Sequence, residues 1–232
     1  IGQNKQAINY WEKALEKYPL MNEVFINMGV VYERMGEKKK AVESYQKALK
    51  QEFNLPIAHY NLGVIHAKNN DIKKAIEFWE NARKLDPKDG ETLMSLAWAY
   101  EKTGKKEVAL NQILKSIKLE PFNYEFHYAA GRIQSDLGKF EEATESLKKS
   151  INLAPEFGGS YYRLGIVNDN LNNGVDAISN ILIAEMIYHK KRKMNLYKKM
   201  GTRLIAFFGK YKLSRKDFIG QKLPETLQGY EL

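Results

Sequence analysis

Histidines are the residues of this sequence best suited to hold a metal ion or to move a proton near neutral pH. There are four, and only two of them, His59 and His66, lie close together, seven residues apart. A metal site usually needs three or more converging ligands. His59 and His127 fall at places that we expect to line a helical core, and His189 stands apart. We therefore predict that the histidines pack within the fold and that the chain binds no metal.

Neighbouring carboxylates could serve as a general acid and a general base. The pair Glu141 and Glu142, however, stands at an expected helix start, where negative charge complements the helix dipole. The sequence has no glycine run that could cradle a phosphate and no nucleophile elbow. We therefore expect a protein that is not an enzyme, needs no cofactor and has no small-molecule substrate.

The strongest pattern in the chain is a repeat. Alanine recurs every 34 residues, and a second column of small residues follows seven places after it. Small residues seven apart share one helix face and let a neighbouring backbone approach closely. A period of this length indicates stacked helical hairpins. The alanine column consists of Ala7, Ala41, Ala75, Ala109, Ala143 and Ala177.

The ends of the expected helices follow the same period. Glycine or asparagine stands where the first helix of each hairpin should end in a left-handed residue, a conformation that these two types adopt cheaply. Proline stops the second helix of most hairpins. The left-handed places are Gly36, Asn70, Gly104, Gly138 and Asn172, and the stop residues are Pro19, Pro87, Pro121 and Pro155, with Phe53 in that place in the second unit.

With its Leu-Gly pair, mid-unit tyrosine, two small residues and terminal proline, the unit resembles the tetratricopeptide repeat. Tyr32 and Tyr100 hold the tyrosine place, whereas His66, Gln134 and Asn168 replace it. The resemblance implies an all-α fold, a right-handed superhelical α-solenoid. It covers residues 1–191, as a half repeat over 1–21 and five repeats that start at Asn22, Pro56, Gly90, Tyr124 and Gly158.

The charge of the chain is concentrated at its end. Residues 1–188 hold 25 basic and 25 acidic side chains, so the net charge of +9 belongs wholly to residues 189–232. We expect residues 192–232 to form a basic amphipathic capping helix and an extended tail. Tyr197, Met200, Leu204 and Phe208 would form its apolar stripe. The predicted basic patch is Lys190, Lys191, Arg192, Lys193, Lys198, Lys199 and Arg203.

In a superhelix of hairpins, the first helix of each repeat lines the concave face. Aromatic and amide side chains there would suit an extended peptide, because an amide can satisfy a peptide backbone and an aromatic ring supplies contact area. The same columns could instead serve packing between helices. The candidate peptide-binding residues are Ile26, Asn27, Tyr60, Asn61, Met94, Trp98, Tyr128, Arg132, Tyr162 and Arg163.

The resemblance to the family also indicates which features of a peptide the groove could recognise. Asn27 and Asn61 are similar to the asparagine ladder with which some tetratricopeptide arrays hold peptide backbones, but Ser95 and Ala129 interrupt it. Family members that clamp the carboxyl terminus of a chaperone need Lys, Asn and Arg at set places. Only Asn61 matches, and Glu91 would repel a carboxylate, so the sequence argues against that ligand.

We therefore predict a non-enzymatic adaptor whose concave groove binds a peptide segment of a partner protein. The alternative is a scaffold that docks on an anionic membrane surface or on nucleic acid through its basic end. A third hypothesis is the targeting module of a larger enzyme. Absence of cysteine is compatible with any compartment, and we favour the cytoplasm. Because the chain opens inside a hairpin, we expect an upstream helix to have been removed, and a signal or an anchor could have been removed with it.

Overall fold

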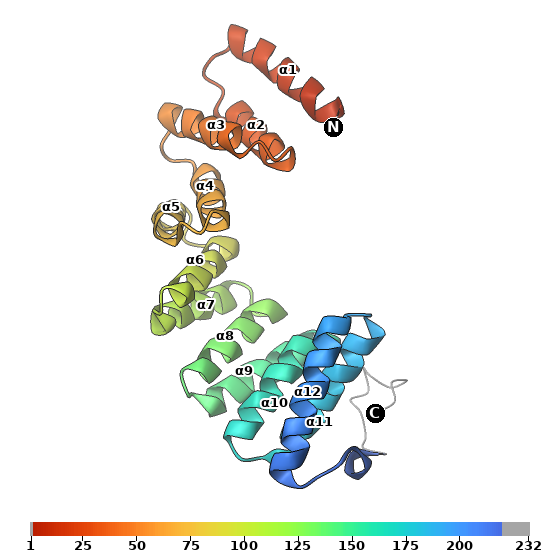
Figure 1. The fold of residues 1–232 in the computed structure, drawn as a ribbon. Helices are drawn as coiled ribbons and strands as arrows, with labels where there is room; N and C mark the ends of the chain where they lie inside the picture. The colour runs from red at the N-terminus through yellow and green to blue at the C-terminus, as the bar shows by residue number, and fades with distance from the viewer. Residues whose placement is uncertain (1, 220–232) are drawn as a thin grey trace. The chain divides into compact units, whose positions relative to one another are not determined.

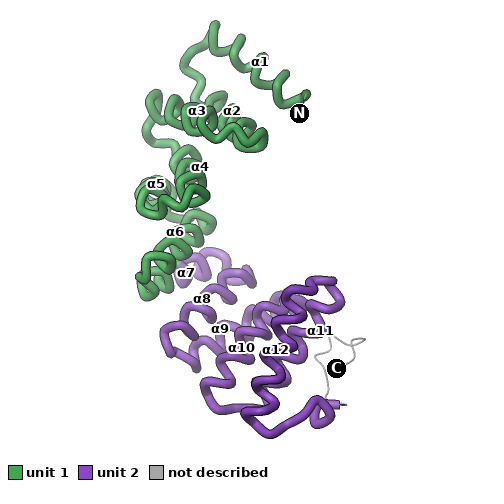
Figure 2. The backbone as a smooth tube through the Cα atoms, in the orientation of Figure 1, with its two compact units in different colours: residues 1–112 green, residues 113–232 purple. Residues whose placement is uncertain are grey.

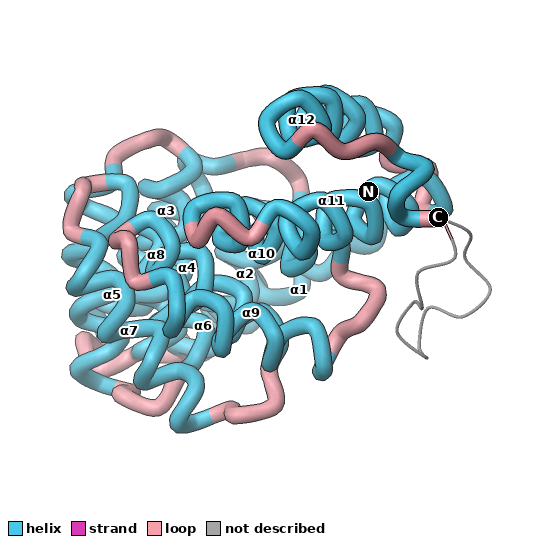
Figure 3. The backbone as a smooth tube through the Cα atoms, turned by 90° about the horizontal axis from the view of Figure 1, so that it is seen from below, coloured by secondary structure: helices cyan, strands magenta, loops and turns pink. Residues whose placement is uncertain are grey.

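The repeated pattern of small and large residues produces a succession of helices of similar length. The computed structural model describes residues 2–219, which form α-helices and one 3₁₀ turn, without a strand in that range (Figures 1 and 3). The predicted all-α fold is therefore confirmed. The helices are α1 (Gly2–Lys17), α2 (Asn22–Arg34), α3 (Lys38–Gln51), α4 (Pro56–Lys68), α5 (Ile72–Leu85), α6 (Gly90–Lys102), α7 (Lys106–Leu119), α8 (Tyr124–Asp136), α9 (Phe140–Leu153), α10 (Gly158–Asn170), α11 (Gly174–Lys190) and α12 (Met194–Tyr211), followed by the 3₁₀ turn η1 (Arg215–Phe218).

The helices pack as hairpins of consecutive elements. Helix α2 packs on α3, α4 on α5, α8 on α9, and α10 on α11. The first helix of each of the five repeats begins at the residue where the sequence pattern predicts that repeat to start. Neighbouring hairpins then stack, because α3 also contacts α4, α5 contacts α6, and α9 contacts α10. This is the arrangement of a helical solenoid.

The turns within the hairpins depend on left-handed residues. All five predicted positions have positive φ, from 58° at Asn172 to 79° at Gly104 and Gly138. Such a residue lets the chain reverse while the next backbone N–H still reaches a carbonyl of the helix that has ended. In the first of these turns, for example, the N–H of Glu37 donates to the carbonyl oxygen of Tyr32 at 2.9 Å. The turn prediction is therefore confirmed.

Glycine within a helix marks the closest approach of two helices in a hairpin. A Cβ atom added at Gly131 of α8 would lie 2.6 Å from Cγ of Leu147 and 3.1 Å from the carbonyl oxygen of Ala143, both in α9. Gly165 of α10 meets Ile181 of α11 in the same way. The large residue between the two small-residue columns of a second helix thus fills the space that glycine leaves on the first.

The chain divides into two compact units, residues 1–112 and residues 113–232 (Figure 2). Helices α1 to α6 belong to unit 1, and α8 to α12 belong to unit 2; the boundary falls within α7. In unit 1 the core is built around Tyr45, Leu62 and Trp79. In unit 2 it is built around Leu147, Ile181 and Leu204.

Helix α12 covers the last hairpin of unit 2, as the amphipathic pattern indicates. Met200, Leu204 and Phe207 are buried against apolar residues of α11. Tyr197 and Phe208, which the sequence also assigned to the stripe, are half-buried. Beyond α12, the turn η1 buries Phe218 in the same cluster. The sequence did not predict this turn, and residues 220–232, the end of the predicted extended tail, lie outside the described residues.

None of the helices in residues 2–219 combines the length and the apolar character that crossing a bilayer requires.

Candidate functional site

The first helices of unit 1 carry six of the candidate residues on α2, α4 and α6. Asn27 is exposed, and Tyr60, Asn61 and Met94 are half-buried. Trp98 keeps 39% of its surface exposed, whereas Ile26 keeps only 8% and belongs to the core cluster. The structure therefore leaves the candidates other than Ile26 with side-chain surface that a partner could contact.

Two of these candidates line a pocket of about 480 Å³ within unit 1. Tyr60 and Asn61 lie on its α4 side, together with Pro56 and the exposed side chain of Ile57. The opposite side is formed by the loop before α6 and by the first turn of that helix. The carboxylates there are those of Asp86, Asp89 and Glu91. The residues that line this pocket thus offer an aromatic ring, an amide and three acids, with no basic side chain among them.

The acidic side of the pocket is held by the start of α6. Asp89 is the N-cap of this helix, and its carboxylate accepts hydrogen bonds from the backbone N–H of Glu91 at 3.3 Å and of Thr92 at 3.1 Å. A carboxylate at this place is favoured by the helix dipole as well as by the hydrogen bonds. Asp86 accepts from the N–H of Lys88 at 3.1 Å. Two of the three acids, Asp86 and Asp89, are therefore fixed by the backbone of the loop and the helix.

The aromatic side of the pocket is fixed as well. The indole N–H of Trp79 donates to the carbonyl oxygen of Tyr60 at 3.1 Å. Burial raises the pKa of the Tyr60 hydroxyl, a hydrogen bond with Ser95 lowers it, and the charges of Glu91 and Asp89 raise it. The hydroxyl consequently stays protonated at neutral pH, close to the negative charges of Glu91 and Asp89.

Asn61 also has a role inside the protein. The hydroxyl of the fully buried Tyr45 donates to Oε1 of Glu33 at 3.0 Å, and Glu33 pairs with Lys68 at 3.3 Å. Burial raises the pKa of Tyr45 well above its usual range, Glu33 adds to this, and a hydrogen bond from Asn61 opposes it. The Asn61 amide thus helps to join α2, α3 and α4, which the sequence pattern did not reveal.

Trp98 forms an aromatic pair with Trp79 in unit 1. Its ring meets that of the buried Trp79 edge-on, with 6.3 Å between centroids, and Nζ of Lys102 lies 5.9 Å above it. Edge-on packing fixes the orientation of the indole while leaving part of its surface accessible. Trp98 is therefore a rigid, partly exposed aromatic residue on α6.

The candidates in unit 2 are more engaged within the fold. The ring of Tyr128 packs edge-on against Phe157 at 5.0 Å, and Nζ of Lys199 lies 5.0 Å from the ring centre of Tyr162. Arg163 forms an ion pair with Asp136 at 2.9 Å. Arg132 is half-buried. The packing alternative that the sequence left open therefore has structural support in this unit.

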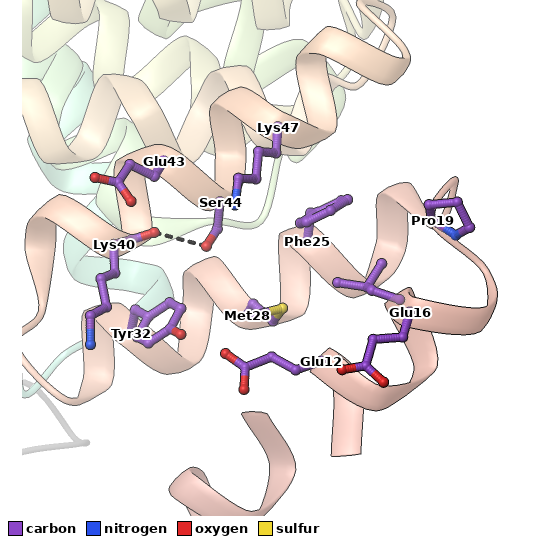
Figure 4. Close-up of a pocket in the computed structure, with 11 residues that line it drawn as sticks. Glu12, Glu16, Pro19, Phe25, Met28, Tyr32, Lys40, Glu43, Ser44 and Lys47 are labelled. Carbon is purple, nitrogen blue, oxygen red and sulfur yellow. Dashed lines mark hydrogen bonds between the residues drawn. The ribbon is translucent and has the colours of Figure 1, made fainter. Parts of the chain in front are cut away.

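A second pocket lies among α1, α2 and α3, and none of the predicted residues lines it (Figure 4). Its volume is about 540 Å³. Phe25, Met28 and Tyr32 of α2 contribute apolar surface, while Glu12 and Glu16 of α1 point toward it (Figure 4). Lys40, Glu43 and Lys47 of α3 complete the rim, so it mixes both signs of charge. No sequence signal marks this pocket, because it arises from how α1 rests on the next hairpin.

The histidines make packing contacts. Nε2 of the buried His59 lies 3.0 Å from the carbonyl oxygen of Phe53, and Nε2 of His127 lies 2.8 Å from that of Pro121. His66 stacks on Phe78 with 5.3 Å between ring centres. For His59 and His127 the predicted packing role is confirmed. In residues 2–219 no three His, Asp or Glu side chains gather in a way that could hold a metal ion.

Models of known protein families match the repeated part of the chain. Models described as tetratricopeptide repeat match residues 56–89, 90–123 and 124–157, and a model described as TPR repeat matches residues 34–70. These matches and the stacked hairpins place the chain in the tetratricopeptide repeat family. Its class is therefore that of a helical-repeat scaffold for protein–protein interaction.

Solved structures share the fold at low sequence identity. YrrB, described as a TPR protein with an unusual peptide-binding site, is 20% identical, with a TM-score of 0.70 over 76% of this chain and 91% of that one. MamA is 22% identical, with a TM-score of 0.68 over 74% and 94%. MamA of Desulfovibrio magneticus RS-1 is 18% identical, with a TM-score of 0.68 over 73% and 96%. No curated protein matches the sequence.

Proposed function

We propose that unit 1 binds an extended segment of a partner protein across α4 and α6, with the pocket at Tyr60 as its principal contact. The observation that carries this proposal is the pocket itself, where two residues predicted from the repeat pattern meet the backbone-anchored carboxylates of Asp86 and Asp89 and the carboxylate of Glu91. Rigid aromatic residues supply contact area at low cost in entropy. The peptide-binding site named for YrrB, a protein with the same fold, is consistent with this role.

The chemistry of the pocket favours a segment that carries lysine or arginine. A cationic side chain could pack its methylene groups on Tyr60 and Ile57 while its charge approaches Asp86, Asp89 and Glu91. An acidic segment would be repelled by the same groups. Trp98 and Met94, further along α6, would contact neighbouring side chains of the segment. Asn27 on α2 would extend the contact toward the start of the chain.

A library of random peptides displayed on phage provides a probe that assumes no partner. Peptides selected on the full chain should be enriched in lysine or arginine. Binding of a selected peptide should weaken by at least about tenfold in Tyr60→Ala and in Trp98→Ala, because buried aromatic contacts dominate such interfaces. Glu91→Lys should weaken it through charge. The exposed Tyr10 of α1 provides a control, since Tyr10→Ala should leave affinity unchanged.

The two asparagines need a separate control. Replacing Asn27 and Asn61 together by alanine should weaken peptide binding, but Asn61→Ala also removes a hydrogen bond near Tyr45. Thermal unfolding of each variant separates the two effects, because Asn27→Ala should leave stability unchanged. If Tyr60→Ala, Trp98→Ala and Glu91→Lys all bind the selected peptides as the natural sequence does, the proposal is wrong.

A further inference from the structure

We propose that the outer face of α12, with the turn that precedes it, docks on the surface of a bilayer that contains anionic phospholipids. This surface belongs to unit 2 and is independent of the peptide-binding proposal. Within residues 189–219 the chain has eleven lysines and arginines and a single acid, Asp217. Helix α12 itself contains no acidic residue. A strongly basic surface of this kind attracts the negative leaflet of a membrane.

Packing determines which way these charges face. Because Met200, Leu204 and Phe207 occupy the inner side of α12, the lysines are directed to its outer side and flanks. Lys193, Lys198 and Lys199 are all exposed. The helix is also fixed in place, since Nζ of Lys210 pairs with Asp169 at 2.6 Å and the hydroxyl of Tyr211 donates to the same carboxylate at 2.8 Å. The basic surface is thus preformed.

Nearby acids pair with some of these positive charges. Lys191 pairs with Glu156 at 3.3 Å, and Arg215 pairs with the buried Glu185 at 2.6 Å. Together with the Lys210 pair, these contacts account for three of the eleven positive charges. The carboxylate of Asp217 accepts from the backbone N–H of Ser214 at 2.6 Å and serves as a cap. A strong excess of positive charge therefore remains at this end of unit 2.

Exposed apolar side chains distinguish a bilayer from nucleic acid as the partner. Ile205 is 76% exposed and Met194 is 47% exposed. They are eleven residues apart, about three helical turns, and therefore lie along one stripe of α12, with Lys198 close to the line between them. Apolar side chains among lysines can enter the boundary between headgroups and acyl chains. A nucleic acid backbone would gain nothing from an exposed isoleucine.

The turn before α12 adds a place for a lipid phosphate. Arg192, Lys193, Met194, Asn195 and Leu196 line a hollow of about 470 Å³. Lys193 is the N-cap of α12, and no side chain accepts a hydrogen bond there, nor does the first turn hold an acid. The positive end of the helix dipole and two cationic side chains therefore face one hollow. A phospholipid headgroup carries the matching charge.

Flotation of the full chain with phosphatidylcholine vesicles, with and without phosphatidylserine, tests the proposal. We expect binding only to the vesicles that contain phosphatidylserine, with a steep loss at high salt. The double variant Lys193→Glu, Lys198→Glu should bind at least about thirtyfold more weakly, given the usual contribution of each basic residue near a membrane. Its matched control is Lys5→Glu with Lys13→Glu on α1, which changes net charge equally and should bind normally.

A second variant separates a membrane from a nucleic acid. Ile205→Ser should weaken vesicle binding by about fivefold and leave the circular dichroism spectrum unchanged, whereas Leu20→Ser, at an exposed leucine of unit 1, should have no effect. The proposal fails if the natural sequence does not bind anionic vesicles, or if the double charge reversal binds them normally. It also fails if a DNA duplex binds more tightly than the vesicles and Ile205→Ser changes neither.

Discussion

At the scale of single residues, glycine decides how closely two helices of a hairpin can approach. Gly131 and Gly165 face large side chains of the following helix, and a Cβ atom at either place would also press on a backbone carbonyl oxygen. The two glycines stand at the same place of neighbouring repeats, 34 residues apart. Gly209 is also helical, but nothing lies within 4 Å of an added Cβ atom there.

These two environments predict opposite effects of one substitution. Gly131→Ala should lower the free energy of unfolding by about 1–3 kcal/mol, because Leu147 and the backbone of α9 must move. Gly209→Ala should raise it by about 0.5–1 kcal/mol, because alanine loses less entropy in a helix. Urea unfolding of both variants measures the difference. A Gly131→Ala variant as stable as the natural sequence would contradict the close packing.

His59 should make stability depend on pH. Burial lowers its pKa below the usual 6.5, against the opposing effect of its hydrogen bond to the Phe53 carbonyl. Below pH 6.5 the unfolded chain therefore takes up the proton first, and this site's contribution to stability declines as the pH falls further. Urea midpoints measured between about pH 7 and pH 5 should fall less in His59→Gln than in the natural sequence. The control is His189→Gln, at an exposed histidine. If the urea midpoints of the natural sequence, His59→Gln and His189→Gln all fall equally with pH, the prediction is wrong.

Side-chain networks mark the limit of sequence reasoning at this scale. The repeat pattern identified Tyr60 and Asn61 as surface candidates, and the structure places both at one pocket. It did not reveal that Asn61 reaches Tyr45, because that contact joins two helices through a buried hydroxyl with no periodic signal. The acids at Asp86 and Asp89 were missed for a similar reason. They lie in the loop between α5 and α6, and the conformation of that loop, which has no periodic signal, brings them to α4.

At the scale of elements, α12 is the least repetitive part of the helical array. Its amphipathic stripe was predicted, and Met200 and Leu204 are buried as expected. Phe207 is buried, whereas Phe208, which the sequence assigned to the stripe, is half-buried and packs against the same cluster. The turn η1 had no sequence signal, since four residues carry no helical period.

Adjacent residues of α12 provide a test of its role as a cap. Leu204 is buried in the cluster with α11, whereas Ile205 is exposed. Leu204→Ala should lower the free energy of unfolding by about 2–5 kcal/mol through lost burial and a cavity. Ile205→Ala should change it by less than about 0.5 kcal/mol. Chemical denaturation distinguishes them, and equal effects would mean that α12 does not cover the core.

At the scale of the whole molecule, the sequence predicted the class of fold because the same pattern of small residues and turn residues recurs every 34 residues. The two compact units differ in how far the first helices of their repeats keep candidate residues accessible. In unit 1, aromatic and amide residues of α4 and α6 keep accessible surface beside a pocket. In unit 2, Tyr128, Tyr162 and Arg163 are drawn into contacts with Phe157, Lys199 and Asp136. A pattern shared by all repeats cannot express this difference, which depends on the neighbours of each helix.

The three tryptophans offer the most direct test of peptide binding by unit 1. Each indole N–H gives its own signal in a nitrogen-15 correlation spectrum of the full chain. On addition of a phage-selected peptide, we expect the signals of Trp98 and Trp79 to shift, because Trp98 would contact the peptide and Trp79 holds the backbone of Tyr60. Trp11 on α1 should not respond. A shift of Trp11 alone, or no shift while the peptide is bound, would contradict the assignment of the binding face to α4 and α6.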